Sequence, residues 1–367
     1  MPGGGRFTAL GLVQGILQED RVNEYLVLVN KEETSLRSFA NAEQRVIGVQ
    51  NRFGVRAQTQ IMLPSLLRRE KIDVVHFAKN LGAFFLPCKA LVTIYDLTIL
   101  SYPQFFPAVD VAYWRTLQAL FLKTVDQIVV LSEHTKRDLL RYYRLPAEKI
   151  GVVYSACDPM FQPLPAHDVE QARMRYHLPH EYILSVGNIS PKKNFETVVR
   201  ALRYLKDVYH FPHRLVIVGK EYWQGGQRPL QLLIDELGLK EDVLLLGPVV
   251  GRDLVALYNG ATLFAFPSLD EGFGIVLVEA MASGAPVIAS GTSAIPEVVG
   301  NAGILVNEPT DDVELAKAMA LVITDVGLRN SLVQLGYERS RQFSWRRAGS
   351  AYLELYRRLL IGRTCNE

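Results

Sequence analysis

The sequence has few cysteines, no long apolar run and almost no net charge, and each of these absences excludes a class of protein. Cys88, Cys157 and Cys365 show neither the pairing of a disulfide framework nor the spacing of a metal site. So few thiols are typical of a protein of the reducing cytoplasm. No apolar run reaches the roughly 18 residues of a membrane-spanning helix, and no signal peptide is visible. A net charge of +2 is too small to indicate a nucleic-acid-binding protein.

The small net charge is divided unevenly between the two halves of the chain. Residues 1–165 carry 19 basic and 15 acidic side chains, a net charge of +4, whereas the remainder carries −2. A solvated surface explains this difference. The alternative is that the N-terminal half makes a peripheral contact with anionic lipid at the inner face of the membrane.

Apolar segments alternate with helical patterns along the whole chain. Such alternation is typical of βα units around a parallel sheet. Two series are present, so the 367 residues are interpreted as an α/β protein with two doubly wound sheets. The predicted strands of the first series are Tyr25–Val29, 72–77, 91–95, 127–131 and 151–154, and those of the second are Tyr182–Val186, 215–218, 243–246, Leu263–Phe266, 287–289 and 304–306. The predicted helices include 56–70, 111–124, Glu133–Tyr143, 194–208 and 229–237.

A proline-rich stretch separates the two series. Residues 158–180 contain four prolines around a short charged segment, which indicates a connection between domains. The predicted domains are therefore 1–165 and 166–345. The remaining residues, 346–367, hold most of a predicted terminal helix, Trp345–Ile361.

The most informative stretch is 268–284, in which two glutamates lie eight positions apart. Glu271 sits in a glycine-rich loop, and Glu279 is the only residue of 275–282 that is not apolar. A buried helix is expected there, and an ionised carboxylate inside it requires hydrogen-bond donors. The start of this helix supplies backbone N–H groups and a positive dipole end to an anion. A nucleotide-sugar combines such an anion with hydroxyl groups that both carboxylates can accept from.

This stretch resembles the E-x7-E motif of the retaining glycosyltransferases of family 4, which have the two-domain GT-B fold. The resemblance extends over about residues 180–345 and is looser in the N-terminal half. It implies two Rossmann-like domains that face a central cleft, with the terminal helix crossing back to the N-terminal domain. The further segments that carry it are 186–194, 215–219, 243–247, 285–290 and 295–300.

In this family the segment 186–194 is the loop that binds the donor phosphates. The resemblance makes Lys193 a catalytic residue that reaches the diphosphate, with Lys192 expected to point to solvent. Many members carry an arginine where this chain has Asn188, and asparagine keeps a hydrogen-bond donor but loses the charge. Arg6 and Lys220 are the candidates for the missing cation.

The resemblance also assigns the glutamates. It implies that Glu271 accepts hydrogen bonds from the donor sugar and stabilises positive charge at the reacting carbon, and that Glu279 holds the ribose hydroxyls. The alternative for Glu279 is a buried carboxylate paired with a cation. Asp270 is either a loop cap or a sugar contact. Backbone groups that contact sugar and phosphate are expected from Gly272, Phe273, Gly274 and Ile275, although the Phe273 side chain suits the core equally well.

The opening residues resemble the glycine loop that follows the first strand in this family, but no such strand precedes them. The resemblance implies that Gly4 and Gly5 bring backbone N–H groups to the donor phosphate. We expect either a start further upstream or a sheet that lacks a core strand and leaves an edge unpaired.

On the acceptor side, the resemblance places residues at the ends of N-terminal strands. Asp96 is retained as a catalytic candidate, but Tyr95 stands where the family often has a histidine, and tyrosine is not the same proton carrier near neutral pH. His76 ends another predicted strand, where active-site residues gather in open sheets. The alternative is a structural histidine whose hydrogen bonds are made within the protein.

These residues predict a retaining transfer of a hexose from a nucleotide-diphosphate sugar to a glycan or lipid-linked acceptor. Sequences with Gly-Asn at 187–188 resemble mannosyltransferases, which favours GDP-mannose as the donor. No metal or other cofactor is expected, because no Asp-x-Asp and no ligand pair of His or Cys is seen. The alternatives are another GT-B enzyme, such as a sugar-phosphate synthase or phosphorylase, and a binding subunit that has lost catalysis.

Overall fold

The computed structural model describes residues 4–47, 52–80, 82–221 and 227–361. The chain forms two compact units. Unit 1 comprises Met1–Ala156 and Ser344–Glu367, and unit 2 comprises Cys157–Phe343. The first division falls nine residues before the predicted boundary, because 157–165 pack on unit 2. Leu164 N–H donates to Asn259 Oδ1 (2.8 Å), and the Phe161 ring meets Tyr258 edge-on.

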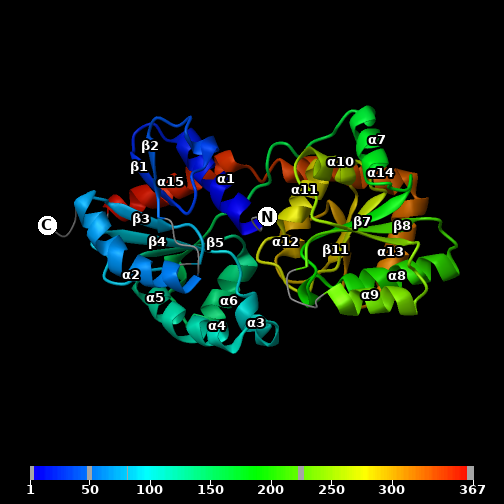
Figure 1. Cartoon of the computed structure of the whole chain (residues 1–367), viewed down its shortest axis with the longest axis horizontal. Helices are drawn as coiled ribbons and strands as arrows, with labels where there is room; N and C mark the ends of the chain where they lie inside the picture. Colours follow the sequence, from blue (N-terminus) through cyan, green and yellow to red (C-terminus); the bar gives the residue numbers. More distant parts are fainter. Residues whose placement is uncertain (1–3, 48–51, 81, 222–226, 362–367) are drawn as a thin grey trace. The chain divides into compact units, whose positions relative to one another are not determined.

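Unit 2 is built on one parallel sheet of six strands in the order β12-β11-β10-β7-β8-β9 (Figure 1). The middle strands are buried on both faces, which explains their unbroken apolar sequences. The strands are β7 (Tyr182–Val186), β8 (Arg214–Val218), β9 (Val243–Gly247), β10 (Leu263–Phe266), β11 (Val287–Ser290) and β12 (Gly303–Val306).

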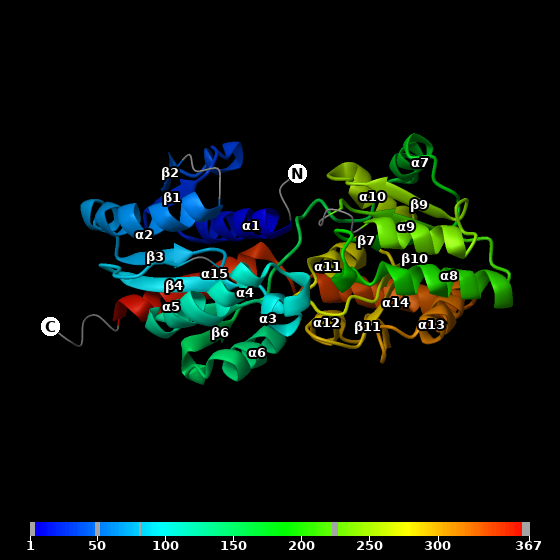
Figure 2. The same ribbon diagram turned by 60° about the horizontal axis from the view of Figure 1, so that its bottom comes forward.

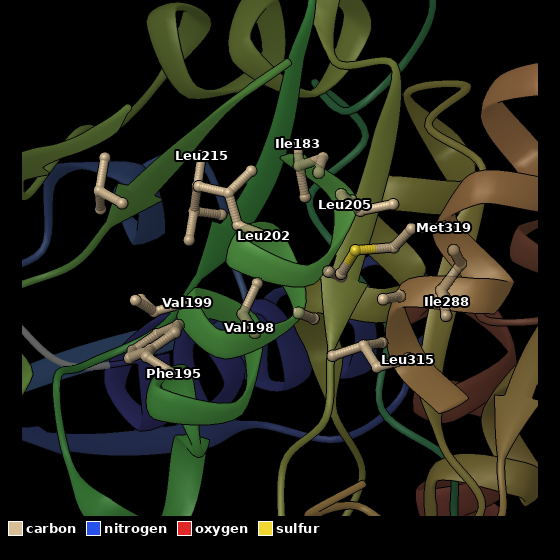
Figure 3. Close-up of a cluster of buried hydrophobic side chains, with 14 of the residues drawn as sticks. Ile183, Phe195, Val198, Val199, Leu202, Leu205, Leu215, Ile288, Leu315 and Met319 are labelled. Atoms are coloured by element: carbon tan, nitrogen blue, oxygen red, sulfur yellow. The ribbon is translucent and has the colours of Figure 1, made fainter. Parts of the chain in front are cut away.

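Helices cover both faces of this sheet, with α8, α9 and α13 on one face and α10, α11 and α14 on the other (Figure 2). Under the first group, apolar side chains such as Ile183, Leu202, Leu215 and Met319 form a continuous core (Figure 3). The helices are α7 (Ala166–Arg175), α8 (Phe195–Val208), α9 (Gln227–Glu236), α10 (Arg252–Gly260), α11 (Ile275–Ala282), α12 (Ile295–Val299), α13 (Asp312–Thr324) and α14 (Val326–Ser340).

Unit 1 contains two separate parallel sheets among its described residues, β1-β2 and β3-β4-β5-β6. In a doubly wound order of 3-2-1-4-5-6, the first strand is the one that would join β1 to β3. The division between the two sheets of the described residues falls at the position of that strand. The strands are β1 (Tyr25–Val29), β2 (Ala42–Val46), β3 (Val74–Phe77), β4 (Lys89–Ile94), β5 (Gln127–Val130) and β6 (Ile150–Val152).

The helices of unit 1 include α15, which is the last element of the described chain. The α15 helix packs along α1 and buries Tyr352 and Leu353 against Leu12 and Leu91, so the predicted return of the terminal helix is confirmed. Ser132 Oγ accepts from Thr135 N–H and caps the N-terminus of α6. The helices are α1 (Gly4–Glu19), α2 (Arg52–Arg69), α3 (Thr98–Ser101), α4 (Ala108–Tyr113), a π turn (Trp114–Gln118), α5 (Ala119–Thr124), α6 (Glu133–Tyr143) and α15 (Trp345–Ile361).

Candidate active site

The candidate site lies at the carboxyl end of the sheet of unit 2, where the strand order reverses. β7 and β10 are neighbours, with β8 beyond one and β11 beyond the other. Open α/β sheets bind ligands at such a switch point. The loop after β7 (187–194) and the loop after β10 (267–274) are joined there, because Leu269 N–H donates to the carbonyl of Lys192 at 2.9 Å and Ser268 Oγ lies 3.1 Å from the same oxygen. The two loops therefore hold each other in place.

Lys193 extends along the first of these loops into the switch point. A Cβ atom on Gly187 would lie 3.1 Å from Lys193 Cε, so the absence of a side chain there gives the lysine stem its path. The ammonium lies 4.7 Å from the centroid of the Phe266 ring and forms an ion pair with Glu271. Lys193 is thereby brought together with the loop glutamate, as the sequence predicts.

Asn194 holds in place the loop after β7, which carries Lys193. Its φ of 54° is left-handed, which asparagine tolerates better than most residues. Its side-chain amide donates to the carbonyls of Pro267 (3.0 Å) and Pro309 (2.7 Å), and its Oδ1 accepts from the Thr197 hydroxyl. The residue thus ties the start of α8 to the loop after β10.

Glu271 is buried at the meeting point of the two loops, with 8% of its surface exposed. Burial by itself raises the pKa of this carboxyl, but Lys192, Lys193 and the Ser268 hydroxyl (2.7 Å) outweigh burial and hold the pKa below 4.5. Its backbone N–H donates to Ser293 Oγ at 2.9 Å. Glu271 is therefore an ionised carboxylate in a fixed position.

Lys192 corrects one expectation. Its side chain does not point to solvent: it is 19% exposed, and its ammonium lies 3.8 Å from Glu271 Oε2. Two lysines thus face the carboxylate of Glu271 beside the start of α11.

The turn 272–274 leads from Glu271 into α11. Gly274 is the N-cap of the helix with φ of 85°, a conformation that favours glycine. The Phe273 side chain is 4% exposed and meets the Phe343 ring edge-on, so it belongs to the core. The backbone of 272–275 thus remains as the part of this turn that can bind an anion.

Glu279 lies about one turn into α11, in a very different setting. Burial raises its pKa from 4.5 to about 7. In the described part of the chain, its hydrogen-bond partner is the Tyr258 hydroxyl, which donates to Oε2 at 3.1 Å, and not a cation. Asp158 and Cys157 are also close enough to influence it. The structure therefore does not support the cation-paired alternative.

The loop after β8 lies against the loop after β7, which contains Asn188. Ile189 N–H donates to the carbonyl of Lys220 at 2.9 Å, and a Cβ on Gly219 would lie only 1.7 Å from the carbonyl oxygen of Gly187. This close approach brings the Lys220 backbone to the edge of the site. The side chain of Arg6, the other candidate cation, lies outside the described residues.

His76 and its neighbours form a hydrogen-bonded network inside unit 1. Its Nδ1 lies 2.7 Å from Tyr356 Oη and its Nε2 lies 2.8 Å from Thr93 Oγ1, which in turn contacts the Tyr352 hydroxyl. Burial lowers the pKa of His76 to about 3, so the ring is neutral. Both nitrogens are used to join β3 and β4 to α15, which favours the structural alternative for this histidine.

The other predicted residues of unit 1 lie at its N-terminus and at the end of β4. Gly4 and Gly5 lie in the first turn of α1 rather than in a loop before it. Asp96 accepts from Thr98 N–H at 3.2 Å and so fixes the start of α3. Burial raises the pKa of Tyr95, which keeps its hydroxyl protonated.

The Tyr95 hydroxyl faces a small cavity at the carboxyl ends of the strands of unit 1. Ser155, Thr93, Thr8 and Tyr352 also line this cavity. Within the described ranges, the buried hydroxyls of Tyr95 and Ser155 have no hydrogen-bond partner. They are therefore able to bind a polar group.

Sequence reasoning did not assign several residues that shape the site. Ser268, three positions before Glu271, is a signal that a loop carboxylate has a hydroxyl donor nearby. Ser293 and Asn194 sit in loops whose packing decides their role. Tyr258 reaches Glu279 from a different helix, and no sequence spacing indicates that contact.

Two family models match this chain and together span most of it. The model of the glycosyl transferases group 1 matches residues 172–339, and that of glycosyltransferase family 4 matches residues 17–161. The first match contains the whole site at the switch point. The chain therefore belongs to glycosyltransferase family 4 and is a glycosyltransferase of the hexosyltransferase type.

Similar proteins agree with this assignment. O-antigen chain mannosyltransferase B of Escherichia coli is 28% identical over 79% of this chain and 76% of its own length. The serotype-specific mannosyltransferase WbdA of E. coli is 30% identical over 64% of this chain, which spans 29% of that longer protein.

Solved structures define the fold as GT-B. WaaG, a glycosyltransferase involved in lipopolysaccharide biosynthesis, superposes with a TM-score of 0.75 at 17% identity, covering 97% of both chains. HepE from Anabaena in complex with UDP-glucose gives a TM-score of 0.76 at 20% identity, covering 97% of this chain and 96% of HepE. In the ranges described here, no helix is long and apolar enough to cross a membrane, and no group of three or more His, Cys, Asp or Glu side chains is arranged to hold a metal.

Proposed function

We propose that this chain is a retaining mannosyltransferase that transfers mannose from GDP-mannose to a glycan or lipid-linked acceptor in cell-surface polysaccharide synthesis. The observation that carries the proposal is the cluster of Lys192, Lys193 and Glu271 at the switch point beside the start of α11. The names of the relatives, mannosyltransferases of O-antigen chains, support the choice of sugar and acceptor class.

Donor binding divides among three parts of unit 2. Lys193 and the first N–H groups of α11 bind the diphosphate, since a helix N-terminus and a lysine both favour an anion. Glu271 accepts hydrogen bonds from hydroxyls of the sugar. Glu279 accepts hydrogen bonds from the ribose hydroxyls.

The reaction breaks the bond between the anomeric carbon and the phosphate oxygen. Positive charge develops on the sugar as this bond opens, and the ionised carboxylate of Glu271 stabilises it. Lys193 stabilises the negative charge on the departing diphosphate. The acceptor hydroxyl attacks from the same face and gives its proton to a phosphate oxygen, so the configuration at the anomeric carbon is retained.

The proposal includes no metal ion and no cofactor besides the donor substrate. Lys192 and Lys193 supply the positive charge that a divalent cation supplies in metal-dependent transferases. We place the reaction in the cytoplasm at the inner face of the membrane. Exposed Val109, Leu117 and Leu120, in the helical segment 108–124 of unit 1, support a peripheral contact there.

Binding of nucleotide-sugars tests the proposal. Thermal unfolding is followed with GDP-mannose, UDP-glucose, UDP-N-acetylglucosamine and ADP-glucose, each with and without a chelator. A donor at about 100 times its dissociation constant stabilises a fold by about 2.7 kcal/mol, which is a measurable shift. We expect GDP-mannose to give the largest shift, and transfer to a mannan acceptor to yield an α-linked product by NMR.

Each part of the proposed function is refuted by a different outcome. A larger shift with a UDP-sugar would refute mannose but keep the transferase, and a β-linked product would refute retention. Loss of binding on chelation would refute the metal-independent mechanism. No response to any donor would refute the proposed activity of this chain.

A further inference from the structure

Tyr258 is a buried phenol that the proposed chemistry leaves without a role. It lies on α10 with 0% of its surface exposed, and its hydroxyl donates to Glu279 Oε2 at 3.1 Å. Buried phenols usually find a hydrogen-bond partner, and the partner of the Tyr182 hydroxyl is the backbone carbonyl of Leu257 at 2.7 Å. Tyr258 is instead directed at a carboxyl group in the candidate site.

The position of this hydroxyl is set by rigid packing. The Tyr258 ring meets Phe264 edge-on at 5.4 Å and Phe161 edge-on at 6.0 Å, between centroids. The phenol therefore has little freedom to move, and the hydrogen bond fixes one carboxyl oxygen of Glu279. A carboxylate accepts through both oxygens, so the second one is oriented without being used by the phenol.

The remaining groups around Glu279 oppose its ionisation. The titratable and charged groups that face it are Tyr258 from α10 and Cys157 and Asp158 from the segment that precedes α7. Burial disfavours the charged form and Asp158 repels it, whereas the Tyr258 hydrogen bond favours it. Removing the hydroxyl therefore both releases the carboxyl group and makes it harder to ionise.

We propose that Tyr258 is a positioning residue for donor recognition, which orients the Glu279 carboxylate toward the cis-diol of a ribonucleoside diphosphate. This inference rests on the proposed function, because it needs a nucleotide donor at the switch point. It adds that selectivity for ribose over deoxyribose depends on a residue that does not itself touch the nucleotide.

The test compares Tyr258→Phe with Tyr182→Phe, which removes a buried hydroxyl in the same unit without affecting Glu279. Calorimetry gives the dissociation constants of GDP, UDP and 2′-deoxy-GDP at pH 6, 7 and 8.5. For Tyr258→Phe we expect GDP to bind about tenfold more weakly at pH 7, as for loss of a hydrogen bond to a charged group. The loss should be smaller at pH 8.5, where the carboxyl is ionised in both proteins, and smaller for 2′-deoxy-GDP. Tyr182→Phe should match the wild type.

A structural role predicts a different pattern. If Tyr258→Phe weakened GDP and 2′-deoxy-GDP equally, or bound GDP as the wild type does at every pH, the inference would be refuted while GDP binding by the wild type still supported the proposed function. Failure of the wild type to bind either ribonucleotide would refute the proposed function itself. In a Glu279→Gln background, Tyr258→Phe should lose its pH dependence, which gives a second test in a protein without the titrating group.

Discussion

The two glutamates at the ends of the stretch 271–279, one in a loop and one in a helix, lie in opposite surroundings. Glu271, in the loop before α11, faces two lysines and a serine hydroxyl, and its pKa is lowered. Glu279, inside the helix, faces a phenol, a thiol and another carboxylate, and its pKa is raised to about 7. One carboxylate is ionised at all neutral pH values, and the other changes its protonation near neutrality.

The difference shows that position in the fold, and not residue type, assigns the chemistry. A permanently ionised group suits stabilisation of developing positive charge, which is needed only in the transition state. A carboxyl that ionises when hydrogen-bond donors reach it suits recognition of hydroxyl groups in the ground state. The same separation of two carboxylates by environment recurs in hydrolytic enzymes.

The largest expected effect is on turnover. Glu271→Gln should lower kcat by about 10²–10³-fold, because it removes a charge that acts in the transition state. Glu279→Gln should raise KM several-fold and change kcat little, because it weakens binding of ground and transition states alike. Steady-state kinetics with GDP-mannose measures both, with exposed Glu236→Gln as the control. Equal effects on kcat from the two substitutions would remove the distinction between the glutamates.

The next effect is on stability, and it has a defined pH dependence. The folded pKa of Glu279 lies above its unfolded value of 4.5, so its stabilising contribution is complete below pH 4.5 and lost as pH rises through about 7. The glutamine of Glu279→Gln does not ionise, so the variant does not lose this part of its free energy of unfolding as pH rises. It should exceed the wild type in free energy of unfolding by on the order of 3 kcal/mol at pH 8.5 and equal it near pH 4. Urea unfolding at the two pH values measures the difference, and a constant difference would contradict the raised pKa.

Much of this arrangement could be predicted from the sequence, because it depends on local pattern. The apolar run around Glu279 predicted a buried helix, and the glycines before it predicted the turn. The strand Tyr25–Val29 and the helix Trp345–Ile361 have the predicted bounds. What could not be predicted depends on contacts between distant segments. Tyr258 reaches Glu279 across 21 positions of the chain.

The wrong expectation for Lys192 has the same physical cause. Adjacent residues usually point in different directions, so the neighbour of a lysine that enters a site is expected to reach solvent. The 3₁₀ turn Pro191–Lys193 and the carbonyl of Lys192, which accepts from the loop after β10, bring both side chains toward Glu271. These contacts are made with the loop after β10, which is distant in the sequence, so the residues next to Lys192 do not indicate them.

The loop glutamate should show the opposite pH dependence of stability. The folded pKa of Glu271 lies below its unfolded value, so its contribution is present above pH 4.5 and lost as pH falls through the lowered pKa. Glu271→Gln should therefore be less stable than the wild type by about 2 kcal/mol at pH 7, since hydrogen bonds to a charged group are lost. The difference should shrink toward zero in acid. Chemical unfolding at pH 7 and pH 3.5 tests this, and a stabilised variant at pH 7 would contradict the depressed pKa.

The smallest expected effect is that of removing Lys192, the second lysine that faces Glu271. Lys193→Ala should nearly abolish transfer, whereas Lys192→Ala should lower kcat/KM by less than about tenfold. The Lys192 ammonium is 3.8 Å from Glu271 Oε2, beyond hydrogen-bond distance, and alanine keeps the backbone carbonyl that accepts from the loop after β10. Exposed Lys240→Ala is the matched control for loss of one positive charge from unit 2. A loss as large as that of Lys193→Ala would show that both lysines bind the diphosphate directly.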